Sequence, residues 1–233
     1  GLPIDFDTAG VTYALTGFGG AEDATVVAGV AGANGSVARV VKSATAELWA
    51  GTTVSTGANQ SIATIPFTAT ARSMTLRVRA PAAGVVVRLK VEDAADPTHS
   101  VETEATTTVA NAWETLTFNF ANQAAGTAAL NLAFTYNKAS VFFAFGTTGA
   151  AGGAGTYYFD ELNFVAGGGG GGGGGGTVAG LPSDFDTAGV TYTLTGFGGA
   201  EDATVAAGVA GALKKVEAQV GLRRADAVDG VDG

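Results

Sequence analysis

The sequence contains no cysteine, only 5 prolines and few charged residues. Without cysteine no disulfide can cross-link the fold, so stability must come from a hydrophobic core or a bound metal. Charged residues make up 14% of the 233 residues, while glycine, alanine, threonine and valine dominate. This composition favours short strands joined by glycine turns, and it does not favour long helices.

Positive charge is especially scarce. The chain has 12 lysines and arginines against 21 aspartates and glutamates, a formal net charge of -9. Nucleic acids and anionic membranes are bound through clustered lysine and arginine, so we expect neither as a partner. No stretch reaches the roughly 18 apolar residues of a membrane-spanning helix, so we expect no membrane span either.

The N-terminal segment is repeated near the other end of the chain. Residues 1–33 recur as residues 180–212 with three differences, Ile4 to Ser183, Ala14 to Thr193 and Val27 to Ala206. Ten consecutive glycines, at residues 167–176, lie between the copies and favour a flexible linker. The sequence diverges after the second copy. Two interpretations of this last segment remain, a short helix and a disordered tail. We therefore divide the chain into a domain at 1–166, a polyglycine linker at 167–179, a truncated repeat at 180–212 and a divergent tail at 213–233.

Within the first domain, apolar and polar residues alternate. Residues 74–79 and 85–92 each place apolar side chains on one face and charged or polar ones on the other. Similar runs occur at 116–120, 141–145 and 158–164, separated by turn signals. About ten strands without intervening helices predict an all-β fold, a two-layer antiparallel β-sandwich of the jelly-roll type.

The same alternation predicts which side chains share a face in the last two runs. It places Val141 with Phe143 and Phe145. In the final run it places four residues on one face, namely Tyr158, Asp160, Leu162 and Phe164.

Seven short motifs occur in a fixed order along residues 1–166. They are Leu2-Pro3-Ile4-Asp5-Phe6-Asp7, Val40-Val41-Lys42 with Leu48-Trp49-Ala50-Gly51, Met74 to Arg79 with Pro81, Val87-Arg88-Leu89-Lys90-Val91-Glu92, Asn111-Ala112-Trp113-Glu114 with Leu116-Thr117-Phe118, Phe142-Phe143 with Phe145-Gly146, and Tyr157-Tyr158-Phe159-Asp160-Glu161-Leu162. Together they resemble the jelly-roll carbohydrate-binding modules appended to polysaccharide-degrading enzymes of marine bacteria, of the laminarin- and xylan-binding type. The chain departs from that pattern at Ala144, where an acidic residue is expected.

This resemblance implies a secreted or cell-surface module that binds a polysaccharide, either a β-glucan, a xylan or an acidic algal glycan. It also implies a structural Ca²⁺ that ties the first strand to the last. Asp7 and Asp160 match the ligand positions, with Asp5 and Glu161 as near alternatives. Calcium prefers oxygen ligands, and joining the chain ends would stabilise a sandwich without disulfides. The alternative is that Asp7 and Asp160 only cap turns.

Sugar binding requires an aromatic platform with polar groups beside it. Trp49 is the first candidate, because the two small residues after it leave room for a ligand. A core or edge tryptophan fits the same pattern equally well. Trp113 is expected to be structural, and Tyr13, like Phe18 and Tyr136, is a weaker candidate for which packing is favoured.

Charged residues on the two alternating strands give a second set of candidates. If these strands share one polar face, Arg77, Arg88 and Glu92 could bind sugar hydroxyls, or the basic residues could hold a uronate or sulfate. Cross-strand ion pairs on a solvated face explain the same pattern.

An enzymatic function is not indicated. His99 is the single histidine, and because the chain has no cysteine, His99 cannot activate a cysteine nucleophile. The acidic pairs Glu22-Asp23, Glu92-Asp93 and Asp160-Glu161 are adjacent in sequence and would point to opposite faces of a strand. We therefore expect a non-catalytic module that targets an attached enzyme or cell surface to a glycan. The alternative is a structural subunit of a tandem surface array or fibre, which self-associates when the truncated repeat adds a strand to a neighbouring domain.

Overall fold

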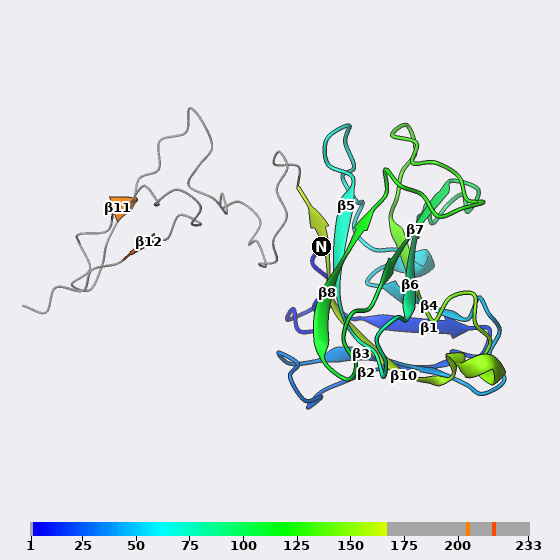
Figure 1. The fold of residues 1–233 in the computed structure, drawn as a ribbon. Coiled ribbons are helices and arrows are strands. Elements are labelled where there is room, and N and C mark those ends of the chain that lie inside the picture. The colour runs from blue at the N-terminus through cyan, green and yellow to red at the C-terminus, as the bar shows by residue number, and fades with distance from the viewer. Residues whose placement is uncertain (1, 167–203, 206–215, 218–233) are drawn as a thin grey trace, which may run out of the picture. The chain divides into compact units, whose positions relative to one another are not determined.

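The computed structural model describes residues 2–166, 204–205 and 216–217. Residues 2–166 form a sandwich of two antiparallel sheets with five strands each (Figure 1). The predicted all-β sandwich is therefore confirmed. Among the described residues, no helix is both long and apolar enough to cross a membrane.

Each sheet combines strands that are distant in sequence. The first sheet has the order β1 (Ala14–Phe18), β4 (Gly51–Ser55), β9 (Lys138–Phe143), β6 (Val86–Glu92) and β7 (Ser100–Thr106). The second has the order β2 (Asp23–Val27), β3 (Val37–Lys42), β10 (Gly155–Val165), β5 (Ser73–Arg79) and β8 (Trp113–Asn119). Two short helical turns, η1 (Ala58–Gln60) and η2 (Gly149–Gly153), lie in the loops.

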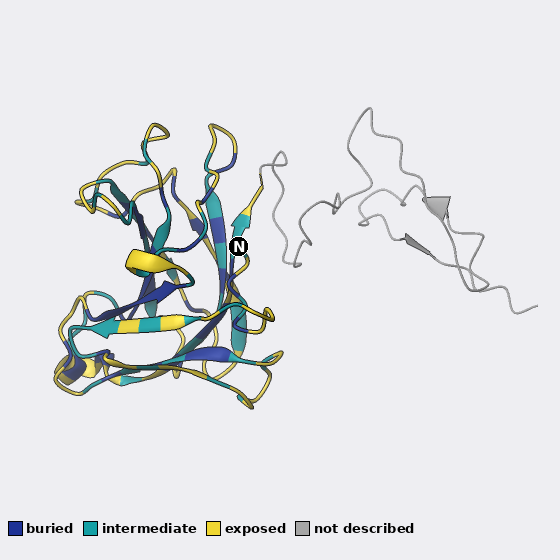
Figure 2. Cartoon of the chain, turned by 180° about the vertical axis from the view of Figure 1, so that it is seen from behind, coloured by how far each residue is buried: buried dark blue, intermediate teal, exposed yellow. Residues whose placement is uncertain are grey.

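The core lies between the two sheets and is built from the alternating residues. The apolar side chains of β5 and β6 that alternation predicts to point inward are all 0% exposed, and Phe118 and Phe120 join them. They are Met74, Leu76, Val78, Val87, Leu89 and Val91. Figure 2 shows stretches of buried residues in dark blue along the strands, and exposed residues in yellow along many of the loops.

Consecutive strands β5 and β6 belong to different sheets, because the turn between them carries the chain from one sheet to the other. Their outward faces therefore lie on opposite sides of the sandwich. The expectation that Arg77 and Arg88 share one polar face is wrong. Alternation determines which side chains point away from the core, but it does not determine which strands are neighbours.

Two residues with left-handed backbone interrupt the alternation. Ala144 has a φ of 47° immediately after β9, so Phe145 leaves the core side that holds Phe143. Glu161 has a φ of 50° at a register shift in β10, so Leu162 returns to the core although Asp160 faces outward. The predicted shared faces for Phe143 with Phe145, and for residues 158–164, are therefore wrong beyond these points.

Little of the second copy lies within the described residues. Thr204–Val205 (β11) pairs antiparallel with Val216–Glu217 (β12). In the repeat, β11 corresponds to Thr25–Val26 of β2. The predicted linker at 167–179, and the rest of the truncated repeat and divergent tail, lie outside the described residues.

Candidate functional site

The outward side of the first sheet, here called the β6 face, carries four neighbouring aromatic rings. Trp49 stacks on Phe18 with centroids 6.2 Å apart, and Phe18 meets Phe142 edge-on at 5.6 Å. Phe142 in turn contacts Phe145 at 5.8 Å. We call these four residues the aromatic strip. They come from the β3–β4 loop, β1, β9 and the segment after β9, so the fold assembles the strip from distant parts of the chain.

Glycines make room for the aromatic strip. A Cβ added to Gly51 would lie 2.6 Å from the ring of Phe142 and 2.8 Å from that of Phe18. At Gly19, where φ is 67°, a Cβ would lie 2.8 Å from the Trp49 ring. Gly51, the second small residue after Trp49, therefore serves ring packing. The indole remains 48% exposed, which is unusual for so large an apolar side chain.

Buried Lys42 holds the segment that positions Phe145. Its Nζ donates to the carbonyls of Phe143, Ala144 and Thr147 at 3.2, 3.0 and 2.8 Å. Burial lowers the pKa of this lysine below its ordinary value. The turn after β9 is thus fixed from the core side, with Phe145 directed to the β6 face.

Arg88 lies at the end of the aromatic strip. Its guanidinium lies 3.5 Å from the centroid of the Phe145 ring. It also forms ion pairs with Glu102 at 2.8 Å and Glu104 at 2.6 Å on neighbouring β7. The arginine side chain is 12% exposed, and the two ion pairs fix its position over the ring. This is the cross-strand ion pairing that the sequence left as an alternative to ligand binding.

Glu92 is the centre of a second charged group on the β6 face. It pairs with Lys90 on the same strand and with Lys138 on β9, the latter at 2.9 Å. Burial alone would raise the pKa of Glu92, but the two lysines lower it below its ordinary value. Between this group and the aromatic strip, the hydroxyls of Thr53 and Ser140 are 2.7 Å apart.

The β6 face therefore brings together three of the residues proposed from sequence: Trp49, Arg88 and Glu92. Its rings can cover the apolar face of a pyranose, and its charged and hydroxyl groups can bind sugar hydroxyls. Sequence reasoning assigned no ligand role to Phe142, Phe145, Glu102 or Glu104. The Phe142-Phe143 doublet was the available signal, because one of two adjacent strand residues must point outward.

The other two proposed sugar-binding residues lie elsewhere. The Tyr13 hydroxyl donates to Asp5 at 2.7 Å, and its ring packs 5.2 Å from that of Phe6. Arg77 lies on the second sheet, where its guanidinium covers the Trp113 ring at 4.7 Å and donates to the Gly32 carbonyl at 2.7 Å. Both side chains therefore have partners away from the β6 face.

The proposed metal ligand Asp160 lies near the carboxylate of the other, Asp7. Burial raises the pKa of Asp160 to about 7, and the nearby carboxylates of Glu161 and Asp7 contribute to the increase. The hydrogen bond from the Glu161 backbone N–H and the positive charge of the Arg77 side chain both oppose it. Asp7 accepts the backbone N–H of Ser36 at 3.0 Å.

A cation would relieve the repulsion between these carboxylates. The described residues contain no group of three or more side chains placed to hold a metal, and Arg77 lies 3.9 Å from Asp160 as a competing positive charge. Main-chain carbonyls or water would have to complete the shell of a calcium ion. Calcium at Asp7 and Asp160 stays a prediction.

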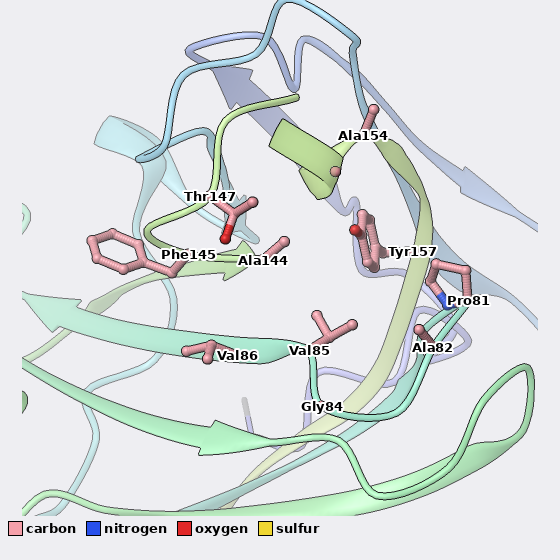
Figure 3. A pocket seen from close by; sticks show the side chains of 11 residues that line it. Pro81, Ala82, Gly84, Val85, Val86, Ala144, Phe145, Thr147, Ala154 and Tyr157 are labelled. Carbon is pink, nitrogen blue, oxygen red and sulfur yellow. The ribbon is translucent and has the colours of Figure 1, made fainter. Parts of the chain in front are cut away.

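A cavity of about 210 Å³ adjoins the aromatic strip at Phe145. The turn between β5 and β6 and the segment between β9 and β10 line this cavity. In Figure 3, Tyr157 and Phe145 lie on different sides of it, and the Phe145 ring points away from Tyr157. The Tyr157 hydroxyl already donates to the Gly153 carbonyl at 3.0 Å. The cavity therefore offers a ligand both polar and apolar surface.

No protein-family model matches the chain, and no curated protein matches it in sequence. Similar solved structures include the family 11 carbohydrate-binding module from Clostridium thermocellum in complex with a β-1,3-1,4-mixed-linked tetrasaccharide, at 13% identity and a TM-score of 0.46 over 70% of this chain and 93% of that chain. The CBM22-2 xylan-binding domain from Paenibacillus barcinonensis Xyn10C is 12% identical, with a TM-score of 0.44 over 70% of this chain and 97% of that chain. Both are carbohydrate-binding modules, the class that the sequence motifs resemble. At these values the likeness assigns neither a ligand nor a site to this chain.

Proposed function

We propose that residues 2–166 form a non-catalytic module that binds a polysaccharide across the β6 face. The observation that supports this most directly is the aromatic strip with its half-exposed Trp49, bordered by charged and hydroxyl groups. Carbohydrate sites combine these two elements, because pyranose rings have both apolar faces and equatorial hydroxyls.

The charges of the β6 face favour a neutral glycan such as a β-glucan or xylan. Each of its three basic side chains already has a glutamate partner: Arg88 pairs with Glu102 and Glu104, and Lys90 and Lys138 pair with Glu92. An anionic sugar would have to displace one of these carboxylates, whereas a hydroxyl can donate to a carboxylate or accept from a lysine without breaking the pair. We propose that the module is secreted or displayed at the cell surface and targets an attached enzyme or the cell itself to this glycan.

Affinity electrophoresis of the full chain in gels with laminarin, mixed-linkage β-glucan or xylan tests the proposal. At least one glycan should retard the protein. Trp49→Ala should weaken that retardation at least about thirtyfold in Kd, the loss typical of a central aromatic anchor. Leu132→Ala is the matched control, because Leu132 is an equally exposed apolar residue, 46% exposed, in another loop. Absence of retardation by all three glycans, or equal effects of the two substitutions, would contradict the proposal.

A second function is favoured by the content of the repeat. Residues 1–33 include β1 and β2, which are edge strands of the two sheets. The duplicated sequence therefore encodes one edge of each sheet, and edge strands can pair with other chains. On this basis the chain would be a subunit of a tandem array or fibre, assembled by strand addition. Sedimentation of the full chain beside a chain ending at Ala166 tests this, because equal self-association of the two would exclude it.

A further inference from the structure

The outward side of the second sheet, here called the β5 face, carries a row of arginine and aromatic residues. Arg39 on β3 and Arg79 on β5 lie directly opposite Tyr158 on β10, one on each side. On the far side of Arg79, Trp113 of β8 continues the row. We call Arg39, Tyr158 and Arg79 the arginine–tyrosine row. It crosses three neighbouring strands.

Arg79 has no acidic partner. Its guanidinium lies 5.7 Å from the centroid of the Tyr158 ring, and its Nε donates to the Asn111 carbonyl at 3.1 Å. No carboxylate of the described residues lies within 4.0 Å of it. Its two terminal nitrogens, which form the fork that binds carboxylates, therefore remain available.

Arg39 has spare donor capacity on the other side of Tyr158. One terminal nitrogen pairs with exposed Asp23 at 2.8 Å, while Nε is buried without a hydrogen-bond partner. The side chain is 34% exposed, so a ligand over Tyr158 can reach it. Tyr158 itself is partly exposed between the two guanidinium groups.

The carboxylates around the row are those of Asp23 and Asp160, with Asp7 and Glu161 near Asp160. Asp160 is 2% exposed and lies beside Arg77, so it presents little charge to solvent. The partner strand β8 places Trp113, Thr115 and Thr117 opposite the outward residues of β5 and so supplies no carboxylate there. Of the two arginines in the row, Arg39 pairs with Asp23 and Arg79 forms no ion pair among the described residues, in a chain whose formal net charge is -9.

We propose that the arginine–tyrosine row is a second glycan site, which binds an acidic polysaccharide through its uronate carboxylates. The Tyr158 ring faces the sugar, and the Arg79 fork, assisted by Arg39, holds the carboxylate. This site lies on the opposite side of the sandwich from the aromatic strip and does not depend on it. Two guanidinium groups beside one ring suit a single anionic sugar, whereas a nucleic acid or anionic membrane would need an extended basic surface.

A matched pair of ligands tests the charge requirement. Polygalacturonate and its methyl ester have the same backbone, but only the first has free carboxylates. The full chain should bind polygalacturonate in affinity electrophoresis or calorimetry at low salt and should bind the methyl ester at least about tenfold more weakly. Binding to polygalacturonate should weaken as salt is raised, because exposed charge pairs are screened.

Variants then locate the site. Arg79→Gln should weaken polygalacturonate binding at least about tenfold, and Arg79→Lys should restore only part of it, because lysine keeps the charge but not the fork. Arg72→Gln is the control, since Arg72 is a partly exposed arginine just before β5 and outside the row. Circular dichroism verifies that each variant is folded.

Three results would overturn the proposal: no binding of polygalacturonate, equal binding of the methyl ester, or equal effects of Arg79→Gln and Arg72→Gln. Equally strong binding of dextran sulfate that is insensitive to Arg79→Gln would show nonspecific ion exchange and would also contradict it. Trp49→Ala separates the two proposals, because it should weaken neutral-glycan binding and leave polygalacturonate binding unchanged.

Discussion

The arginines that lie beside aromatic rings have different partners on the two outward faces of the sandwich. On the β6 face, Arg88 lies 3.5 Å from the centroid of the Phe145 ring and pairs with Glu102 and Glu104 of the adjacent strand β7. On the β5 face, Arg79 lies 5.7 Å from the centroid of the Tyr158 ring, but the adjacent strand β8 offers threonines and a tryptophan. The partner strand, rather than the arginine-bearing strand, therefore decides whether a guanidinium is available to a ligand.

This contrast also separates two roles for aromatic residues. The rings of the β6 face contact one another and leave Trp49 half exposed, which forms a continuous apolar surface. Those of the β5 face alternate with arginines across the strands, so each ring has a cationic neighbour. The first pattern suits a neutral sugar ring, and the second suits a sugar that carries negative charge.

The largest expected effect concerns Asp160, the buried carboxylate of the β5 face. With a chelator present, Asp160 is neutral in the folded state up to its pKa of about 7 but ionises near 3.8 when unfolded. Stability should therefore fall as the pH rises from about 4 to about 7, and Asp160→Asn should remove that fall. At pH 8 the variant should be the more stable protein in urea unfolding, by up to about 4 kcal/mol. A wild-type stability that does not change between pH 5 and 8 would contradict this.

Calcium should reverse the order at pH 8 if Asp7 and Asp160 bind it. Binding to the folded state alone raises its stability, so millimolar Ca²⁺ should increase the melting temperature of the wild type. Asp160→Asn and Asp7→Asn should lose most of this increase. An unchanged melting temperature of the wild type on adding Ca²⁺ would show that the calcium prediction is wrong.

A smaller effect should follow from making the β6 face resemble the β5 face. The double substitution Glu102→Gln and Glu104→Gln removes both partners of Arg88 but keeps the size of the side chains. The β6 face should then gain affinity for polygalacturonate, by roughly fivefold, because the arginine fork is freed. Calorimetry in the Arg79→Gln background isolates this gain. Polygalacturonate binding that stays lost in the triple variant would show that glutamate pairing does not control the choice of ligand.

The smallest expected effect is at Ala144, which turns Phe145 onto the β6 face. Its φ of 47° is unfavourable for alanine and unstrained for glycine. Ala144→Gly should therefore stabilise the fold by about 0.5–1 kcal/mol and leave glycan binding unchanged. Ala144→Val should destabilise it, because a β-branched residue fits this backbone poorly. Urea unfolding measures both, and a stabilising valine would contradict the explanation.

Sequence patterns predicted the sandwich and most of its core from local information. Alternation identified the inward residues of β5 and β6 correctly, and those residues are fully buried. It failed only after Ala144 and Glu161, where a non-glycine residue adopts a left-handed backbone and shifts the following side chains to the other face. Neither residue type signals such a conformation, so this error could not be avoided from composition.

The candidate sites were predicted less completely. Trp49 was identified because of the small residues beside it, and Arg88 and Glu92 because they lie on the polar side of an alternating strand. Arg77 was grouped with them wrongly, since the next strand in sequence lies in the other sheet. The aromatic strip could not be predicted, because its rings come from β1, the β3–β4 loop and the region of β9, which are far apart in the chain.

The sequence by itself therefore determined which side of each regular strand faces the core. That property depends only on the pleat of the backbone and on the transfer of apolar side chains from water. The tertiary structure alone decided which strands are neighbours, and with that which arginines have glutamate partners and which aromatic rings touch. Outward-facing residues are not constrained by core burial, so their partners follow from the order of strands in the sheets, and that order is set by long-range packing.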